Sequence, residues 1–361
     1  MPRYRAGVVG CGGIGRSHAS GYEEHEDVEL VAAADIDPDA VDTFEDRFEE
    51  VPTYDDHDSM LREEDIDLYS VCTSHRSHAS LTVDGIESGV RGVVCEKPMA
   101  TSLGEAIEMA EAAERNDTRL TVGHQRRYWP VNERARELIE ETAIGPVRAV
   151  EMRTTGGLLN IGTHFIDQLL FILGDPGWEW VAGHVERTTD RYERGLEAED
   201  SCIARICLDT GTRFTIESDT ASPLPMECDV LITGRDGTMQ LSFARGRRAA
   251  EDDSQLHVLT SDGTSEYIPS RPRRARLRFV DELIEWIEGN RDDHRCSAEH
   301  SMSTVELMMG LYESVRTQET VTSPLSTRAN PLLEMIESGK LSPKHPGPYD
   351  IRHQYTSVRR E

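Results

Sequence analysis

The chain has 361 residues, long enough for two domains with separate hydrophobic cores. Asp and Glu outnumber Lys and Arg by 67 to 39, giving a net charge of -28 that is spread along the chain. Such a surface argues against nucleic acid and anionic membranes as partners, since both need a basic face. Dispersed carboxylates with few lysines resemble proteins of halophiles, which stay soluble in molar salt. An ordinary acidic protein is the alternative.

Short apolar runs alternate with helical patterns up to residue 123. Helices are expected at 77–88 and 102–116, and the second opens with a capping box formed by Ser102 and Glu105. This repetition predicts an α/β fold with an N-terminal Rossmann domain, a doubly wound parallel sheet over residues 1–123. The strands expected in it are 6–10, 28–35, 66–73, 92–96 and 119–123.

The pattern changes after residue 123. A strand is expected at 147–154, and period-2 alternation with glycine-containing turns runs from 178 to 268. We predict a C-terminal α+β domain with a large, mostly antiparallel open sheet over 124–324. Its helices are expected at 130–141, 161–173, 277–288 and 299–316. Residues 325–361 form a partly extended C-terminal extension. Its last part, from 342, is expected to be extended or poorly ordered unless it docks.

The seven cysteines are odd in number, and several lie inside apolar strand runs. They are interpreted as reduced core residues in a cytoplasmic protein, because no disulfide framework or CxxC pair is present. The first apolar run is five residues long and ends in glycines, so neither a signal peptide nor a membrane span is expected there.

A glycine fingerprint, GCGGIG, follows the first strand and opens a helix, with Gly10, Gly12 and Gly15 at the G-x-G-x-x-G positions. Gly10 permits a tight turn, Gly12 lets a pyrophosphate approach the backbone, and Gly15 allows close packing of helix and strand. Asp35 ends the second strand, where a carboxylate hydrogen-bonds ribose hydroxyls and repels a 2′-phosphate. The expected cofactor is therefore NAD, and NADP is disfavoured. Asp37 is interpreted as a turn residue or helix cap.

The fingerprint, the CEKP segment and the block GGLLNIGTHFIDQLLFILG occur in this order, and together they resemble the Gfo/Idh/MocA oxidoreductase family. That family includes sugar and inositol dehydrogenases and glucose–fructose oxidoreductase. The resemblance extends from residue 4 to about residue 324. It covers TSHRSH, with Ser74 where proline is usual, and VGHQRRYWP. It implies cofactor contacts by Gly10, Gly12, Gly13, Ile14, Gly15, Asp35, Thr73, His78, Glu96 and Lys97.

Lys97 is the only lysine before residue 340. In the family, the lysine of the Glu-Lys-Pro motif lies beside the nicotinamide and the reacting carbon. An ammonium there stabilises alkoxide charge and helps to relay a proton, which the permanently charged planar guanidinium of arginine cannot imitate. By resemblance Glu96 touches the nicotinamide ribose; pairing with Lys97 is the alternative.

The second part of the expected site is LNIGTHFID. The family pattern places an acid four residues before a histidine; here Asn160 replaces the acid and His164 matches the histidine. Residues at i and i+4 share a helix face, so we assign catalysis to Lys97 and His164 jointly, and substrate binding to Arg127, Asn160 and His164. The alternative for His164 is a helix histidine with its hydrogen bonds satisfied. Asp167 is interpreted as a helix-orienting or interface residue, and no metal site is expected because a third ligand is missing.

Arg127 matches the site arginine of the family better than Arg126, which is expected to be solvated. Tyr128 and Trp129 either stack on a ring of the substrate or cofactor, or pack at a hinge. The basic run RPRRARLRF, residues 271–279, is interpreted as a charged helix face that pairs with local carboxylates.

Together these features predict an NAD(P)-dependent oxidoreductase acting on a secondary alcohol or ketone of a sugar, polyol or inositol. By resemblance the assembly is a homodimer or homotetramer. One alternative is a glycosidase that uses NAD for transient oxidation. The other is a non-catalytic cofactor-sensing regulator, although such proteins typically lose the lysine or the histidine.

Overall fold

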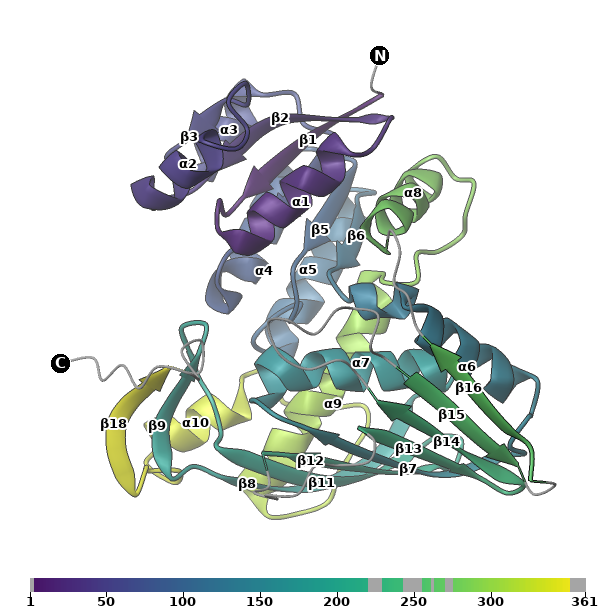
Figure 1. Ribbon diagram of the computed structural model, residues 1–361. Helices are drawn as coiled ribbons and strands as arrows, with labels where there is room; N and C mark the ends of the chain where they lie inside the picture. Colours follow the sequence, from purple (N-terminus) through teal and green to yellow (C-terminus); the bar gives the residue numbers. More distant parts are fainter. Residues whose placement is uncertain (1–2, 220–228, 243–254, 261–262, 270–274, 351–361) are drawn as a thin grey trace. The chain divides into compact units, whose positions relative to one another are not determined.

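The computed structural model describes residues 3–219, 229–242, 255–260, 263–269 and 275–350 (Figure 1). It divides into two compact units. The first comprises Met1–Gln125 and Arg274–Met302, and the second comprises Arg126–Arg273 and Ser303–Glu361. The assignment of cofactor and substrate binding to residues 1–123 and 124–324 stays a prediction.

The first unit contains a six-stranded sheet in the order β3-β2-β1-β4-β5-β6, and all of its pairings are parallel. Its strands are β1 (Tyr4–Val9), β2 (Val28–Ala34), β3 (Thr53–Tyr54), β4 (Leu68–Val71), β5 (Gly92–Cys95) and β6 (Arg119–Val122). This order is the one that dinucleotide-binding folds use, and it confirms the predicted doubly wound sheet. The strands read as near-continuous apolar runs because helices cover both faces. The two-residue strand β3 was not predicted.

Helices flank this sheet in two groups. The helix α1 packs beside α8, and α4 packs beside α5 on the opposite face (Figure 1). The capping box of Ser102 and Glu105 is present at the start of α5, and the Asp37 side chain caps α2 by accepting from the Asp39 amide at 3.1 Å. The helices of this unit are α1 (Gly13–Glu23), α2 (Pro38–Glu45), α3 (His57–Glu63), the 3-10 turn η1 (His75–Ser77), α4 (His78–Glu87), α5 (Leu103–Arg115) and α8 (Ala275–Ile287).

The second unit is built on a nine-stranded sheet in the order β16-β15-β14-β13-β7-β12-β11-β8-β17. Only β7 and β12 pair in parallel, so the predicted mostly antiparallel sheet is confirmed. Its strands are β7 (Val147–Thr154), β8 (Trp178–Glu186), β11 (Ser201–Leu208), β12 (Arg213–Ser218), β13 (Val230–Gly234), β14 (Gly237–Ser242), β15 (Gln255–Thr260), β16 (Ser265–Pro269) and β17 (Val321–Thr322).

The helices α7 and α9 lie on one side of this sheet (Figure 1). A side chain at Gly310 of α9 would come within 2.9 Å of Trp178, so this glycine lets α9 approach β8 closely. The predicted helix 161–173 is preceded by a π-helical turn, which the sequence pattern did not indicate. The helical segments here are the 3-10 turn η2 (Gln125–Tyr128), α6 (Pro130–Glu140), η3 (the π turn, Leu158–Gly162), α7 (Thr163–Ile172), α9 (Ala298–Thr317) and α10 (Pro331–Glu337).

Part of the C-terminal extension pairs with a strand of the second unit. The strand β18 (His345–Asp350) pairs in parallel with β9 (Thr189–Glu193), which also pairs with β10 (Leu196–Glu197). Residues 351–361 lie outside the described residues. Among the described residues, no helix is long and apolar enough to cross a membrane. The six described cysteines are buried and form no disulfide with one another; Cys228 is not described.

Candidate active site

Each of the three fingerprint glycines is suited to its position for a different structural reason. Gly10 has a φ of 98°, and a side chain there would lie 2.5 Å from the Cys72 carbonyl oxygen. A side chain at Gly15 would lie 1.7 Å from the Gly10 carbonyl oxygen, so the helix could not sit so close to β1. At Gly12 nothing lies within 4 Å, and this open space is where a pyrophosphate would approach the start of α1. Gly13 and Ile14 form the first residues of that helix.

Asp35 lies beside this turn, just after β2. One of its carboxylate oxygens accepts from the Cys11 amide at 2.7 Å, and the other accepts from the Asp37 amide at 3.0 Å. These bonds fix the carboxylate at the edge of a pocket of about 460 Å³, which is also lined by Gly10, Gly12 and Thr73. The pocket contains the turn and the acid that a dinucleotide needs, so the residues present fit NAD.

His78 and Thr73 connect the end of β4 to the Glu-Lys-Pro turn. The His78 ring is buried, with Nδ1 2.8 Å from the Pro98 carbonyl oxygen and Nε2 3.3 Å from that of Thr73. Burial lowers the pKa of His78, so the neutral ring donates from Nδ1 to Pro98. The structure thus gives His78 a positioning role for the residues around Lys97. The Thr73 hydroxyl contacts the Ser77 hydroxyl at 2.8 Å and lies at the pocket wall.

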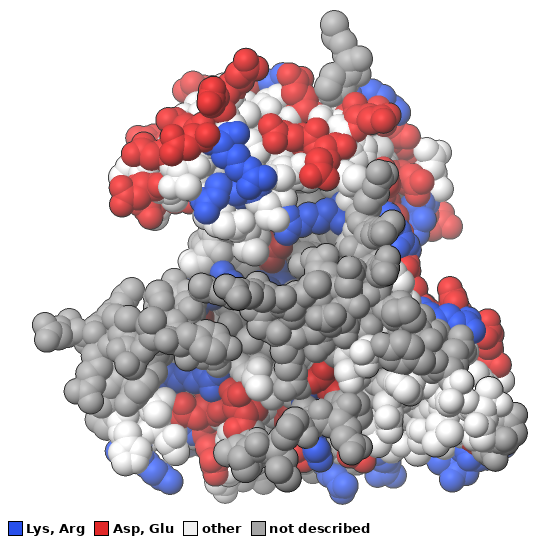
Figure 2. All heavy atoms as spheres, in the orientation of Figure 1, with Lys and Arg blue, Asp and Glu red and all other residues white. Residues whose placement is uncertain are grey.

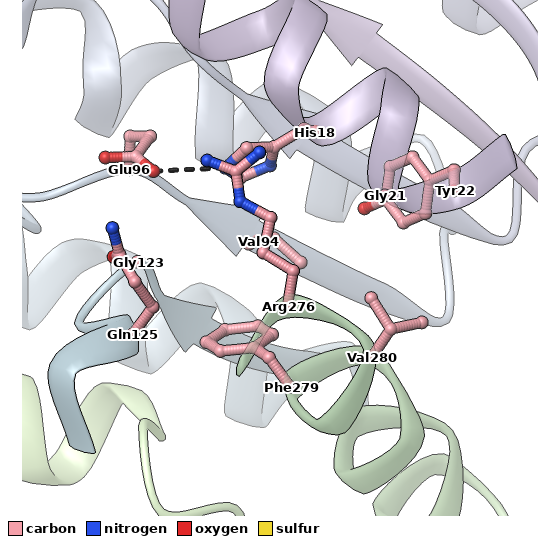
Figure 3. Close-up of a pocket in the computed structure, with 10 residues that line it drawn as sticks. All are labelled: His18, Gly21, Tyr22, Val94, Glu96, Gly123, Gln125, Arg276, Phe279 and Val280. Atoms are coloured by element: carbon pink, nitrogen blue, oxygen red, sulfur yellow. Dashed lines mark hydrogen bonds and ion pairs between the residues drawn. The ribbon is translucent and has the colours of Figure 1, made fainter. Parts of the chain in front are cut away.

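Glu96 is buried, and its carboxylate lies 3.0 Å from Nε2 of His18 (Figure 3). The other His18 nitrogen is 3.1 Å from the Ser70 hydroxyl, which lies 2.7 Å from the Tyr22 hydroxyl. Burial alone would raise the pKa of Glu96. The hydrogen bond and charge of His18, with the charge of Lys97, outweigh burial and lower this pKa to about 2. The carboxylate is therefore ionised at neutral pH, beside the half-buried Lys97.

A small cavity of about 40 Å³ lies next to the pair of Glu96 and His18. Figure 3 shows Gln125 and Arg276 among its lining side chains, with their polar ends on the side of Glu96. The cavity is large enough for a water molecule, although most of its lining is apolar. Arg276, which belongs to the basic run, also donates to the Ser17 hydroxyl. Residues 271–274 of that run lie outside the described residues.

Asn160 and His164 belong to the second unit. Asn160 lies in the π turn η3, where the Gly157 carbonyl oxygen accepts from the amides of Asn160, Ile161 and Gly162 at 3.0 to 3.2 Å. His164 lies in the first turn of α7. Asn160 is 8% exposed and His164 is half-buried, and one turn of helix separates them.

Three carboxylates hold the chain just before Asn160, and we call this group the carboxylate clamp. Three consecutive backbone amides donate to it: Gly156 to Asp219 at 2.8 Å, Gly157 to Glu193 at 2.8 Å, and Leu158 to Glu199 at 2.7 Å. The clamp fixes the start of the segment that carries Asn160 and His164.

Other side chains balance part of the negative charge of the carboxylate clamp. Arg191 pairs with Glu193 and Asp219, each at 2.8 Å, and the Tyr312 hydroxyl donates to Glu199 at 2.8 Å. Burial raises the pKa of Glu199 to about 7. Sequence reasoning missed the clamp, because its bonds join residues 36 to 63 positions apart.

Arg127 occupies a buried ion-pair network. It is 0% exposed, donates from Nε and Nη2 to Asp167 at 2.8 to 3.0 Å, and places Nη1 2.8 Å from Asp175. These partners give Arg127 a structural role, and its position lends no support to the predicted substrate contact. Asp167 orients α7 through this pair, one of the two roles expected for it.

Arg126 was expected to be solvated, and the structure shows it half-buried. Its guanidinium lies over two aromatic rings, with Cζ 5.1 Å from the Trp129 ring centre and 4.8 Å from that of Phe165. Its Nη1 atom is buried and has no hydrogen-bond partner among the described residues.

Two family models match this chain in succession. A model described as "Oxidoreductase family, NAD-binding Rossmann fold" matches residues 4–124, and one described as "Oxidoreductase family, C-terminal alpha/beta domain" matches residues 136–322. The chain belongs to the Gfo/Idh/MocA oxidoreductase family. The resemblance seen in the sequence is thereby confirmed, and the first unit carries the family's NAD-binding Rossmann domain.

Several named dehydrogenases are similar to this chain over most of their length. D-apiose dehydrogenase of Paraburkholderia graminis is 24% identical, over 89% of this chain and 90% of the relative. Myo-inositol 2-dehydrogenase of Thermotoga maritima is 22% identical, over 79% and 87%. D-glucoside 3-dehydrogenase of Escherichia coli is 24% identical, over 87% and 95%.

Solved structures of oxidoreductases share this fold. An oxidoreductase from Agrobacterium radiobacter, solved with NAD+, L-tartaric acid and magnesium, gives a TM-score of 0.73 at 20% identity, covering 89% of this chain and 98% of that one. An NAD binding oxidoreductase from Klebsiella pneumoniae gives 0.75 at 19% identity, covering 90% and 100%. At these identities the likeness establishes the fold alone.

Proposed function

We propose that this oxidoreductase is an NAD-dependent dehydrogenase acting on a secondary alcohol of a sugar, polyol or inositol. The observation that carries the proposal is Lys97. It is the only lysine before residue 340, and it lies directly after β5 and beside the ionised Glu96, in the unit that carries the NAD-binding fingerprint. The names of the relatives, which act on apiose, glucosides and inositol, support the substrate class.

Bound NAD would supply a hydride acceptor, the chemistry that side chains lack. Gly10, Gly12, Gly15 and Asp35 would hold it. The remaining steps belong to side chains. The Lys97 ammonium donates a hydrogen bond to the alcohol oxygen and stabilises the negative charge that grows there as the hydride leaves carbon. His164 accepts the hydroxyl proton, and Asn160 orients the imidazole.

The preference for NAD over NADP is part of the proposal, and Asp35 supports it. Its carboxylate is held at the pocket edge by two backbone amides, where a 2′-phosphate would meet negative charge.

The charge of -28 supports a further part of the proposal, that the enzyme works at high salt. Figure 2 shows carboxylate side chains over much of the visible surface of the first unit. Exposed acids on and after α2 include Asp39, Asp42, Glu45, Asp46, Glu49 and Glu50. By analogy with the family, we also propose that the protein is cytoplasmic and forms a homodimer or homotetramer. Light scattering would measure the oligomeric state.

The test is reduction of NAD and of NADP, followed at 340 nm, across a panel of sugars, sugar acids, sugar phosphates, polyols and inositols in 2 M KCl. The proposal expects NADH formation with at least one member, and its loss in a His164→Ala variant. Release of sugar from a glycoside with no net NADH would instead identify a glycosidase. NAD binding without turnover on any member would contradict the enzymatic proposal.

A further inference from the structure

Arg126 and Arg127 are neighbours in the chain, yet their guanidinium groups have opposite surroundings. Asp167 and Asp175 surround Arg127, whereas the described residues place no carboxylate within ion-pair distance of Arg126. Burial lowers the pKa of Arg126 to about 10, and no neighbouring charge counters that effect. The group therefore stays charged at neutral pH without a counter-ion.

A buried charge without a partner costs free energy, and contacts with two ring faces offset only part of that cost. The rings of Trp129 and Phe165 lie against the guanidinium, and Nη1 on its edge has no hydrogen-bond partner among the described residues. An arginine edge is a planar set of N–H donors that matches a carboxylate or a phosphate with two parallel hydrogen bonds. The missing partner of Arg126 is therefore best supplied by an anionic ligand.

The backbone at Arg126 is also fixed. The buried Asn132 side chain donates to the Arg126 carbonyl oxygen at 2.7 Å and accepts from Gln168 of α7 at 2.9 Å. Phe165, which contacts the guanidinium, directly follows His164 in the same helix. Arg126 is thus tied at two points to the helix that carries the proposed proton acceptor.

We propose that Arg126 binds an anionic group of the substrate, a carboxylate or a phosphate. The alcohol that is oxidised then belongs to a sugar acid or a sugar phosphate, and neutral sugars and polyols are poor substrates. This inference rests on the proposed function, since it names the substrate class of that same site.

The experiment compares matched ligand pairs: D-glucuronate with D-glucose, D-galacturonate with D-galactose, and D-glucose 6-phosphate with D-glucose. Binding to the NAD-loaded protein is measured by calorimetry, and NAD reduction is measured in parallel, at one fixed KCl concentration. The acidic member of at least one pair should bind at least tenfold more tightly. The uronates and the phosphate then tell which anion is recognised.

Two variants test whether Arg126 carries the preference. Arg126→Gln should remove it, lowering affinity for the acid by tenfold or more and changing affinity for the neutral partner less than threefold. Arg126→Lys, which keeps the charge and loses the planar edge, should fall between. The matched control is Arg136→Gln, because Arg136 also lies over a ring, that of Phe171 at 4.7 Å, but is paired with Glu140 and Asp175. It should retain the preference for the acid.

Equal binding within every pair would overturn the inference, as would an acid preference that survives in Arg126→Gln. If acid binding depends on Arg126 but no ligand gives NADH, the anion site at Arg126 is supported. The proposed dehydrogenase activity is then contradicted. The two failures are therefore distinguishable.

Discussion

At the scale of single residues, the role that we assign to an arginine depends on its ion-pair partners. Arg127 and Asp167 are each about 1% exposed, so neither charge can recover its hydration if the other is removed. Asp167→Asn should lower the free energy of unfolding by about 3 kcal/mol, the low end for breaking a buried pair, because Asp175 remains. Urea denaturation at fixed salt measures this change.

The control for this prediction is Glu140→Gln. It removes an exposed partner of Arg136 at i,i+4 spacing and should cost less than about 1 kcal/mol. If Asp167→Asn proves as mild as this control, the buried network is not structural. Arg127 would then regain its candidacy for substrate binding.

Asp35 is the residue that we expect to select the cofactor. Wild-type kcat/KM should favour NAD over NADP, and Asp35→Ser should move the ratio toward NADP by about tenfold or more, because one carboxylate no longer repels the 2′-phosphate. Asp35→Asn is the matched variant, since its amide oxygen can still accept one of the two backbone bonds. Equal kcat/KM values of the wild type with NAD and NADP would show that Asp35 does not discriminate between the two cofactors.

At the scale of elements, the carboxylate clamp fixes the start of the segment that carries Asn160 and His164. Folded Glu199, with a pKa near 7, keeps a proton at pH values where an unfolded glutamate, with a pKa of about 4.3, has lost it. The folded state therefore binds more protons between about pH 4.5 and 7. The contribution of Glu199 to stability falls as the pH rises through that window.

Glu199→Gln should remove this dependence. The free energy of unfolding of the wild type, relative to the variant, should fall by up to about 3 kcal/mol between pH 5 and pH 8. Chemical denaturation across this range, at constant salt, measures the difference. Glu151→Gln, an exposed position on β7, is the control and should leave the wild-type slope unchanged. Parallel curves for wild type and Glu199→Gln would mean that Glu199 is ionised throughout.

Periodic apolar patterns predicted most of the regular elements, since burial on one or both faces is a local property of the sequence. The strand β7 has its predicted bounds, and α9 differs by one residue at each end. The π turn η3 escaped prediction because a 3.6-residue pattern cannot distinguish it from the start of α7. The strand β18 was not predicted because its pairing with β9 joins residues 156 to 158 positions apart, in a proline-containing stretch.

Residues of the candidate site could be predicted only where they belong to a recognisable sequence motif. The glycines, Asp35 and Lys97 follow strand ends, and a strand–turn–helix context gives them meaning. His18 had no such signal, because its contact with Glu96 spans 78 positions and a lone helix histidine is usually structural. The different surroundings of Arg126 and Arg127 depend on which way two adjacent side chains point, which no sequence pattern encodes.

At the scale of the whole molecule, the charge of -28 should make stability depend on salt. The Debye length falls from about 10 Å at 0.1 M to about 3 Å at 1 M, which screens repulsion among the exposed carboxylates. The melting temperature should therefore rise steeply between about 0.1 and 2 M KCl. Removing three exposed acids near α2, by Asp42→Asn, Asp46→Asn and Glu49→Gln, should weaken this rise. A flat profile would mark an ordinary acidic protein.

The central claim is that Lys97 acts on the reacting oxygen of an alcohol while the fold around it only positions it. The most direct measurement is kcat of Lys97→Met on the best substrate of the panel, together with the NAD dissociation constant and the melting temperature of the same variant. We predict a fall in kcat of about 100-fold or more, with NAD affinity within a few fold of wild type and an unchanged melting temperature. A variant that binds NAD and keeps more than half of the wild-type kcat would contradict the claim.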